Sequence, residues 1–488
     1  MENVTAGIDF GTTNSSIIVL KNGVHRYGDS ENETLPSVVA INKENGRVIC
    51  GKDALSLLEK EDNDFEVFRS IKSVLDDRDK TFEIANKIWT PEDIAEQIFI
   101  KLKQTVYERS NREYNVNKAV VAIPVNFSPE KRRILRRAAE RAGIEVKSFI
   151  TESTAAFIAN YKSTKGSTIT VVFDWGGGTL DVSVIEYNHG TISELATRGK
   201  KFAGNDIDEK IARKLHSITE DKYKLHLNFD DLSDAVQNRM LRRCESAKIQ
   251  LSENECAKTF PIKYGDYGQI QIDGNIISRT WLSNLLEEDI NKISECLMES
   301  LRIAKQNIYN VDKIILTGGS CKLKTIQDKM VSKYGKDKII IPQDSSWDVT
   351  LGAAILSCVD YDIQIGTKVS LVLHDGSECP ILTENTFLPY RKKYCFGILD
   401  TTKQARFVFG GDPDINRLED KYRVLDVKCE NFLEEQIILD VYIDEDLMFI
   451  AKANSNFYIY NNPENAYTVF EYPHLKFKYR IDLDHVKY

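Results

Sequence analysis

The chain has 488 residues, which is too long for one compact core, so about two to four domain units are expected. Hydrophobic residues make up 42% and charged residues 28% of the chain, as in ordinary globular proteins, and the net charge is −9. This mild acidity argues against a nucleic-acid partner, and the lack of a run of about 18 apolar residues argues against a membrane-spanning helix.

The start of the chain and its cysteines bear on location. Residues 1–5 contain no basic segment followed by an apolar one, so no secretory signal is expected. The nine cysteines are scattered and form no Cys-x-x-Cys pair or zinc-like cluster with the seven histidines. We therefore expect reduced thiols and a cytoplasmic protein.

Strands and helices are predicted in alternation over the first 358 residues. Helix starts are marked by a capping residue followed by proline, as at Thr90-Pro91 and Ser128-Pro129. We predict strands at 5–10, 16–20, 119–123 and 314–316, a strand–loop–strand unit at 168–186, and helices at 91–109, 128–142, 205–218, 231–252, 280–307 and 322–334. This alternation favours an α/β core.

The pattern changes after about residue 359, where helical periodicity gives way to period-two alternation. Residues 368–373 and 474–483 are examples of such alternating segments. Segments of this kind, separated by turn residues, predict an antiparallel β unit. We place the boundary between the two parts within residues 359–368.

One motif occurs twice. Residues 8–17 (IDFGTTNSSI) and 173–182 (FDWGGGTLDV) each read as a strand that ends in aspartate and an aromatic residue, followed by a glycine/threonine turn and a second strand. The two aspartates, Asp9 and Asp174, are 165 residues apart. Two such copies suggest two similar lobes that face one another.

The turn chemistry suits phosphate. Glycine lets backbone N–H groups approach an anion closely, and threonine adds hydroxyl donors. An aspartate at each strand end could hold a hydrated magnesium ion, which needs few protein carboxylates. A single Gly-Thr-Thr turn is more often just an ordinary hairpin. The two copies, together with a third glycine signal at Thr317-Gly318-Gly319-Ser320, favour a ligand site, although no P-loop is present.

At this point the sequence resembles a known family. Residues 7–15 (GIDFGTTNS) are similar to the first phosphate loop of DnaK-type, seventy-kilodalton heat-shock chaperones. Residues 121–127 and 150–156 resemble the family's connecting segments, and residues 173–183 and 314–320 resemble its second phosphate loop and its adenosine motif. The resemblance is close over residues 4–358, weaker over 369–455 and absent beyond.

The resemblance implies an α/β fold in which an actin-like (ribonuclease-H-like), two-lobed ATPase domain precedes a small antiparallel β-sandwich domain. We expect the ATPase domain at 1–358, with lobes at about 1–187 and 188–358, a linker at 359–368 and the β-rich domain at 369–488. A helical lid has no room in the remaining residues, so we expect the last thirty or so to add strands.

The resemblance also implies ATP or ADP with Mg²⁺ as ligands. Asp9 and Asp174 would orient magnesium-bound waters, Lys72 would place the attacking water, and Pro124 would act as a switch between the lobes. Glu152, Asp181 and Thr179 complete the expected catalytic set. The expected nucleotide-binding residues are Gly11, Thr12, Thr13, Asn14, Gly176, Gly177, Gly178, Thr179, Gly204, Glu245, Lys248, Ser252, Gly318, Gly319 and Ser320. Without the family, Lys72 would read as a surface lysine and Glu152 as a helix-capping glutamate.

Glu245, Lys248 and Ser252 fall on one helical face, which is compatible with nucleotide contact or with a solvated polar stripe.

Two positions depart from the family. The family usually has arginine where this chain has Ile249, so the loss of a stacking guanidinium predicts altered nucleotide affinity. Ser346 stands where the family commonly has aspartate.

The linker and the C-terminal β unit also depart from the family pattern. The linker region, DYDIQIG at 360–366, lacks the family's leucine run, which puts communication between the domains in question. Residues 380–389 and 436–453 resemble the family's early loop and late hairpin. Such a β unit could bind an extended peptide or could only stabilise the protein.

We therefore expect a slow ATPase of the chaperone type, with a peptide or unfolded protein as client and co-chaperones as possible further partners. The alternative is a nucleotide-gated interaction or scaffold protein with little hydrolysis. An actin-like small-molecule kinase fits less well, because it would not need the C-terminal β unit.

Overall fold

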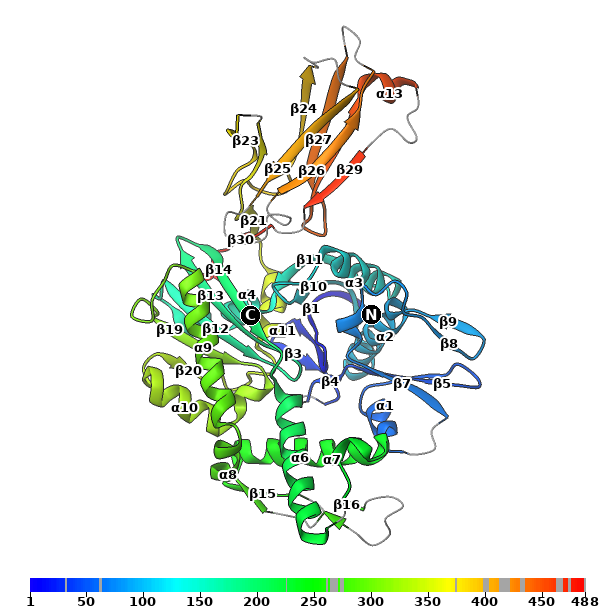
Figure 1. Ribbon diagram of the computed structural model, residues 1–488, viewed down its shortest axis with the longest axis vertical. Helices are drawn as coiled ribbons and strands as arrows, with labels where there is room; N and C mark the ends of the chain where they lie inside the picture. Colours follow the sequence, from blue (N-terminus) through cyan, green and yellow to red (C-terminus); the bar gives the residue numbers. More distant parts are fainter. Residues whose placement is uncertain are drawn as a thin grey trace.

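A computed structural model describes the chain, with the exception of a set of short segments. These are residues 31–32, 61–63, 225, 260–261, 264–270, 273–275, 374, 398–402, 412–421, 431–434, 462–467, 473–474 and 487–488. Residue 474, at the start of one predicted alternating segment, therefore lies outside the described residues. Figure 1 shows a two-lobed α/β body with a slender β-rich unit standing on one side of it.

The first lobe is built on a sheet with the strand order β11–β10–β1–β2–β3, and β4 pairs with β2. The strands are β1 (Glu2–Phe10), β2 (Asn14–Leu20), β3 (Val24–Tyr27), β4 (Leu35–Pro36), β10 (Tyr114–Ile123) and β11 (Glu145–Thr151). β1 and β2 form an antiparallel hairpin, whereas β10 pairs in parallel with β1, and β11 pairs in parallel with β10. Parallel pairing requires crossover helices, which α2 (Pro91–Arg109) and α3 (Pro129–Arg141) supply.

The two crossover helices begin where the sequence predicts. Thr90 caps α2 through a reciprocal capping box with Asp93, and Pro91 occupies the first turn. Ser128 caps α3 by accepting a hydrogen bond from the backbone N–H of Lys131. The smaller elements of this lobe are α1 (Lys52–Ser56), α4 (Glu152–Ala159), α5 (Tyr161–Thr164), β5 (Val38–Asn42), β6 (Val48–Cys50), β7 (Phe65–Arg69), β8 (Phe82–Ile84) and β9 (Lys87–Trp89).

The second lobe is built on a seven-stranded sheet with the order β20–β19–β12–β13–β14–β30–β21. Its strands include β12 (Ile169–Trp175), β13 (Leu180–Asn188), β14 (Thr191–Lys200), β19 (Lys313–Thr317) and β20 (Ile339–Ile340). The helices around it are α6 (Gly204–Tyr223), α7 (Asp234–Glu253), α8 (Arg279–Leu285), α9 (Glu287–Ile303) and α10 (Lys324–Tyr334). The predicted lobe boundary near residue 187 therefore falls inside this sheet, because β12 pairs with β13 and β19, and β13 pairs with β14.

Two further details differ from the sequence prediction. The single helix predicted over 280–307 is two helices, α8 and α9, with the break at Leu286, whose side chain is fully buried beside Leu282. A helix was not predicted at α11 (Asp348–Cys358), which packs against β1, β10 and α4 between the two sheets. This helix is apolar on nearly all sides, so it lacks the one-sided periodicity that marks a surface helix.

The β-rich unit contains two antiparallel four-stranded sheets, with the orders β23–β22–β25–β26 and β24–β27–β28–β29. Apolar side chains from both sheets meet in one cluster, which includes Phe409 and Phe449. The elements are β22 (Val369–Val372), β23 (Glu378–Leu382), β24 (Arg391–Gly397), β25 (Gln404–Gly410), β26 (Tyr422–Lys428), β27 (Gln436–Ile443), β28 (Phe449–Ser455), α13 (Asn456–Asn461) and β29 (Thr468–Tyr472).

Both ends of this unit return to the body. The predicted linker forms β21 (Asp362–Ile365), and the chain's last strand, β30 (Phe477–Arg480), lies between β21 and β14. Residues 477–480 were expected in the β-rich domain, but they extend the sheet of the second lobe (Figure 1). The strand itself was expected from the alternating pattern, whereas its partner strand was not. The domain boundaries otherwise stay a prediction.

The β-rich unit also contacts the first lobe. Arg136 on α3 donates through Nε to Asp446 Oδ1 at 2.8 Å and through its other two nitrogens to the carbonyl oxygens of Val146 and Glu445. Both charged side chains of the Arg136–Asp446 pair are buried. Within the part of the chain that the structure describes, no helix is long and apolar enough to cross a membrane.

Candidate functional site

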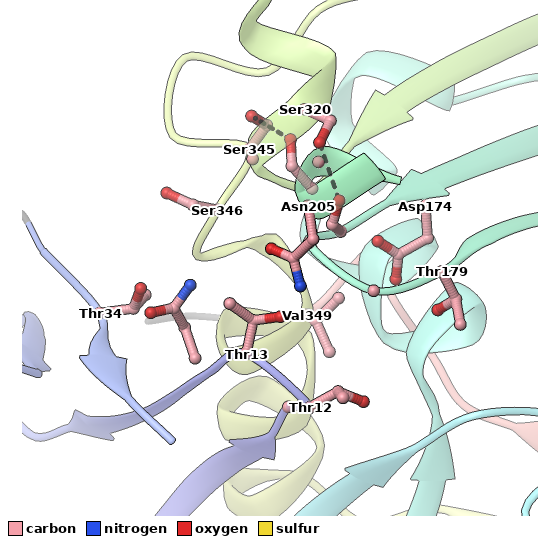
Figure 2. A pocket seen from close by; sticks show the side chains of 18 of the residues that line it. Thr12, Thr13, Thr34, Asp174, Thr179, Asn205, Ser320, Ser345, Ser346 and Val349 are labelled. Atoms are coloured by element: carbon pink, nitrogen blue, oxygen red, sulfur yellow. Dashed lines mark hydrogen bonds between the residues drawn. The ribbon is translucent and has the colours of Figure 1, made fainter. Parts of the chain in front are cut away.

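A cavity of about 310 Å³ lies between the two lobes. It is lined by both glycine/threonine turns, by the third glycine turn and by α7, and Figure 2 shows Thr12 and Thr13 on one side with Asp174 and Thr179 on another. The predicted residues that line it are Asp9, Gly11, Thr12, Thr13, Asn14, Lys72, Glu152, Asp174, Gly176, Gly177, Gly178, Thr179, Gly204, Glu245, Lys248, Ser252, Gly318, Gly319 and Ser320, as well as Pro124. Asp181 lies behind the second turn, where it pairs with Asp174 across the β12–β13 hairpin. The structure thus brings the predicted residues together, and their roles remain a prediction.

The turn between β1 and β2 needs glycine at its start. A Cβ atom on Gly11 would lie 2.0 Å from the carbonyl oxygen of Asn14, which no side chain tolerates. Two buried oxygens of this hairpin, Thr13 Oγ1 and Asp9 Oδ1, have no hydrogen-bond partner among the described residues. Buried polar atoms are normally paired, so both are suited to a ligand or to bound water.

The turn between β12 and β13 is held against its neighbours by backbone contacts. The backbone N–H groups of Gly204 and Asn205, at the start of α6, donate to the carbonyl oxygens of Gly176 and Gly177 at 3.1 and 2.8 Å. Ser320 Oγ donates to the same Gly176 oxygen at 2.8 Å. The turn, the α6 start and the third glycine turn therefore form one rigid wall of the cavity.

The two hairpin turns approach each other closely. A Cβ atom on Gly177 would lie 2.6 Å from Thr13 Oγ1 and 2.9 Å from Thr13 Cβ. The contact with Thr13 of the opposite lobe thus requires glycine at this position, whether or not a ligand is bound. The same closeness lets the amides and hydroxyls of both turns reach a single polyphosphate.

Lys72 and Glu152 form an ion pair at the base of the cavity. Lys72 Nζ donates to Glu152 Oε1 at 2.8 Å, and both side chains are largely buried. Lys72 also lies over the ring of Phe127, at 5.6 Å from its centroid. Lys72 is held on a short helical turn that follows Ser70, and Glu152 is the first residue of α4.

Three aspartates crowd around this pair. Burial raises the pKa of Asp9 to about 7, with a further contribution from the nearby Glu152 carboxylate and an opposing one from Lys72. Burial and Glu152 likewise raise the pKa of Asp181 to about 7 and that of Asp174 well above its ordinary value. Several carboxylates beside one lysine leave uncompensated negative charge, which a divalent cation would relieve. The residues present therefore fit a hydrated magnesium ion.

The α7 side of the cavity is organised by Lys248. Its Nζ donates to Asp208 Oδ2 at 2.7 Å and to the carbonyl oxygen of Gly204 at 2.9 Å, which ties α7 to α6. Burial raises the pKa of Asp208 to about 7, against the opposing effect of Lys248. Ile249, at the position where the family usually has arginine, lines the cavity and is 60% exposed.

Comparison with known proteins decides the family. The family model described as "Hsp70 protein" matches residues 5–403. The chain belongs to the Hsp70 family. Among curated proteins, this Hsp70 chain is similar to three proteins named "Chaperone protein DnaK". The one from Metamycoplasma hominis is 30% identical over 407 residues, which cover 80% of this chain and 66% of the relative. Those from Mycoplasmopsis agalactiae and Mycoplasmopsis synoviae are 29% identical over 412 and 410 residues, each covering 81% of this chain and 66% of the relative.

This Hsp70 chain thus spans about two thirds of the length of the curated relatives it matches. The family assignment agrees with the observed mixture of helices and several sheets and with the actin-like ATPase fold expected from the family resemblance.

Sequence reasoning missed several residues that line the cavity of this Hsp70 chain, namely Ser16, Thr34, Asn205, Lys322, Leu323, Ser345 and Val349. Lys322 Nζ donates to the hydroxyl of Ser346, the second departure from the family, at 3.1 Å. Asn205 could have been found, because it directly follows Gly204 at the start of a predicted helix. Ser345 and Val349 could not, because the helix that begins beside them was not predicted.

Proposed function

We propose that this Hsp70-family chain is a chaperone-type ATPase that binds Mg²⁺ and ATP between its lobes and hydrolyses ATP slowly to ADP and phosphate. The observation that carries the proposal is one cavity in which two phosphate-suited turns, Asp9, Asp174 and the Lys72–Glu152 pair converge. This reaction needs no covalent nucleophile, since phosphoryl transfer depends chiefly on positioning and electrostatics.

The chain's own residues would divide the work as follows. Thr12, Thr13 and Thr179, together with the turn amides, would bind the phosphate oxygens. Asp9 and Asp174 would hold the magnesium ion through water, and the ion would supply positive charge to the phosphates. Lys72, held by Glu152, would orient the attacking water and stabilise charge on the transferred group. Glu245, Lys248 and Ser252 would face the nucleoside.

We further propose that the β-rich unit is a β-sandwich that holds an extended peptide or unfolded protein. Its two four-stranded antiparallel sheets and shared apolar cluster support this proposal. Such a unit can bind a peptide through main-chain hydrogen bonds and pockets for alternate side chains. Co-chaperones would be further protein partners, and the cytoplasm is the expected location.

The test is single-turnover ATP hydrolysis with Mg²⁺, with and without an unfolded client, for the wild type and for Lys72→Ala. We expect hydrolysis to fall by about a hundredfold or more in the variant, while ATP still binds. Lys118→Ala is a matched control, because it breaks a Lys–Glu pair of similar length, with Glu145, on the surface. Loss of hydrolysis in the control as well, or no ATP binding by the wild type, would contradict the proposal.

One observation favours the second candidate, a nucleotide-gated scaffold. The β-rich unit is joined to the body by two paired strands and by a buried ion pair, an arrangement that resists separation of the parts. ATP binding without hydrolysis, or hydrolysis that is indifferent to a client, would support the scaffold over the chaperone.

A further inference from the structure

Glu194 on β14 reaches the segment that carries Glu152. The hydroxyl of Thr151 donates to Glu194 Oε2 at 2.9 Å, and the hydroxyl of Ser153 donates to Oε1 at 3.2 Å. The hydroxyl of Thr197 donates to the same carboxylate. A small part of the side chain reaches the surface. Burial raises the pKa of Glu194, and hydrogen bonds from the hydroxyls of Thr197, Thr151, Ser183 and Ser153 oppose that rise. The carboxylate is thus embedded among hydroxyl donors and forms no ion pair with the residues that the structure describes.

The two hydroxyls from this segment come from both neighbours of Glu152. Thr151 is the cap of α4, and its Oγ1 accepts a hydrogen bond from the backbone N–H of Thr154 at 3.3 Å. Glu152 is the first residue of the helix and holds Lys72 at 2.8 Å. Glu194 therefore fixes the chain immediately before and immediately after the residue that holds Lys72.

We propose that Glu194 is a positioning residue for the hydrolysis reaction, which sets the orientation of Glu152 toward Lys72 by anchoring Thr151 and Ser153. This inference rests on the proposed function, in which Lys72 and Glu152 act on bound ATP. A reacting group displaced by about 1 Å can lose on the order of a hundredfold in rate. The residues that would bind phosphate and nucleoside lie on other segments, so nucleotide affinity depends little on Glu194.

The test compares Glu194→Ala with Glu194→Gln. An amide has the same shape as the carboxylate, and the three hydroxyls can rotate so that each donates to or accepts from it. We expect Glu194→Ala to lower the single-turnover hydrolysis rate at least tenfold while the Kd for ATP changes less than threefold. Glu194→Gln is expected to stay within threefold of the wild type in both quantities. Glu186→Ala, on the adjacent strand β13, is the control carboxylate.

Hydrogen-exchange mass spectrometry supplies a readout that does not depend on activity. We expect faster amide exchange over residues 149–158 in Glu194→Ala, because the anchored cap of α4 loosens, and wild-type exchange in Glu194→Gln. A purely structural role would weaken ATP binding and hydrolysis in parallel, and this outcome overturns the proposal. Wild-type hydrolysis in Glu194→Ala overturns it as well.

Failure of the proposed function would look different. A wild-type protein that binds ATP without hydrolysing it would contradict the ATPase proposal. In that case, faster exchange in Glu194→Ala alone would still support the anchoring of α4 by Glu194, whereas unchanged exchange would overturn it.

Discussion

The molecule contains two junctions of opposite character. The cavity between the lobes leaves buried polar atoms such as Asp9 Oδ1 and Thr13 Oγ1 without partners among the described residues. At the junction with the β-rich unit, by contrast, Arg136 uses its three nitrogens on the chain's own oxygens, and two strands complete the sheet. The first junction is suited to completion by a ligand, and the second is completed by the chain. A conformational response to a nucleotide can therefore arise at the first junction, between the lobes.

The largest effect is expected at the second junction. Without Arg136, the buried Asp446 keeps only the longer, 3.8 Å contact with Arg133. Because a buried charge that loses its main partner is strongly destabilising, Arg136→Ala should lower the free energy of unfolding by up to about 3–5 kcal/mol. Urea unfolding followed by tryptophan fluorescence measures this change in the body of the molecule. The double variant Arg136→Met/Asp446→Leu is the control, since it removes both charges and should recover most of the loss. An equal loss in the double variant would contradict the role of the isolated charge.

At the first junction, Gly177→Ala tests the contact between the two turns. A Cβ atom at this position would lie 2.6 Å from Thr13 Oγ1, so the turns must move apart. We expect ATP affinity to fall about tenfold or more, measured by titration calorimetry, because both turns are needed to hold the phosphates. Gly397→Ala is the control, because its Cβ atom would meet nothing within 4 Å. Unchanged affinity in Gly177→Ala would show that the turns act independently.

The pH dependence of stability tests Asp208, which accepts a hydrogen bond from Lys248 through Oδ2 and whose buried Oδ1 has no partner among the described residues. The pKa of Asp208 is about 7 in the folded protein and near 3.8 when the group is unperturbed. Between these two values the folded state holds a proton that the unfolded state has lost, so stability falls as the pH rises toward 7 and levels off above it. Asp208→Asn should reduce this slope by at most about 1.4 kcal/mol per pH unit between pH 5 and 7. The check is the midpoint of urea unfolding at each pH without nucleotide; identical slopes would contradict the assignment to Asp208.

The smallest effect is expected from the last strand. The hydroxyl of Tyr479 donates to the carbonyl oxygen of Phe149 at 3.2 Å, and the side chain is buried in an apolar cluster that joins residues of both lobes. Tyr479→Phe leaves that oxygen unpaired and should cost about 1–2 kcal/mol in urea unfolding. Tyr309→Phe is a matched control on a side chain that is 89% exposed. A loss of unfolding free energy of the same size in Tyr309→Phe would show that the Tyr479–Phe149 hydrogen bond is not what stabilises the protein here.

Local sequence determined much of the body. The caps and prolines at Thr90-Pro91 and Ser128-Pro129 predicted the starts of α2 and α3, and the two aspartate-ended strands predicted the hairpins that face each other. These features depend on residues that are close in the chain, and capping and turn chemistry act over only a few residues. Nearly every residue proposed for the nucleotide lines one cavity, although the roles of those residues were carried over from the family resemblance.

Only the tertiary structure decided which distant segments β30 and Glu194 contact. Alternation predicts a strand at β30, but nothing in residues 477–480 shows that they pair with Thr191, Ile192 and Ser193. Likewise, Glu194 reads as one polar residue in an alternating strand until the fold places Thr151 and Ser153 against it. A strand presents the same backbone donors and acceptors to any edge, so its partner is chosen by packing between distant segments, which leaves no local pattern in the sequence.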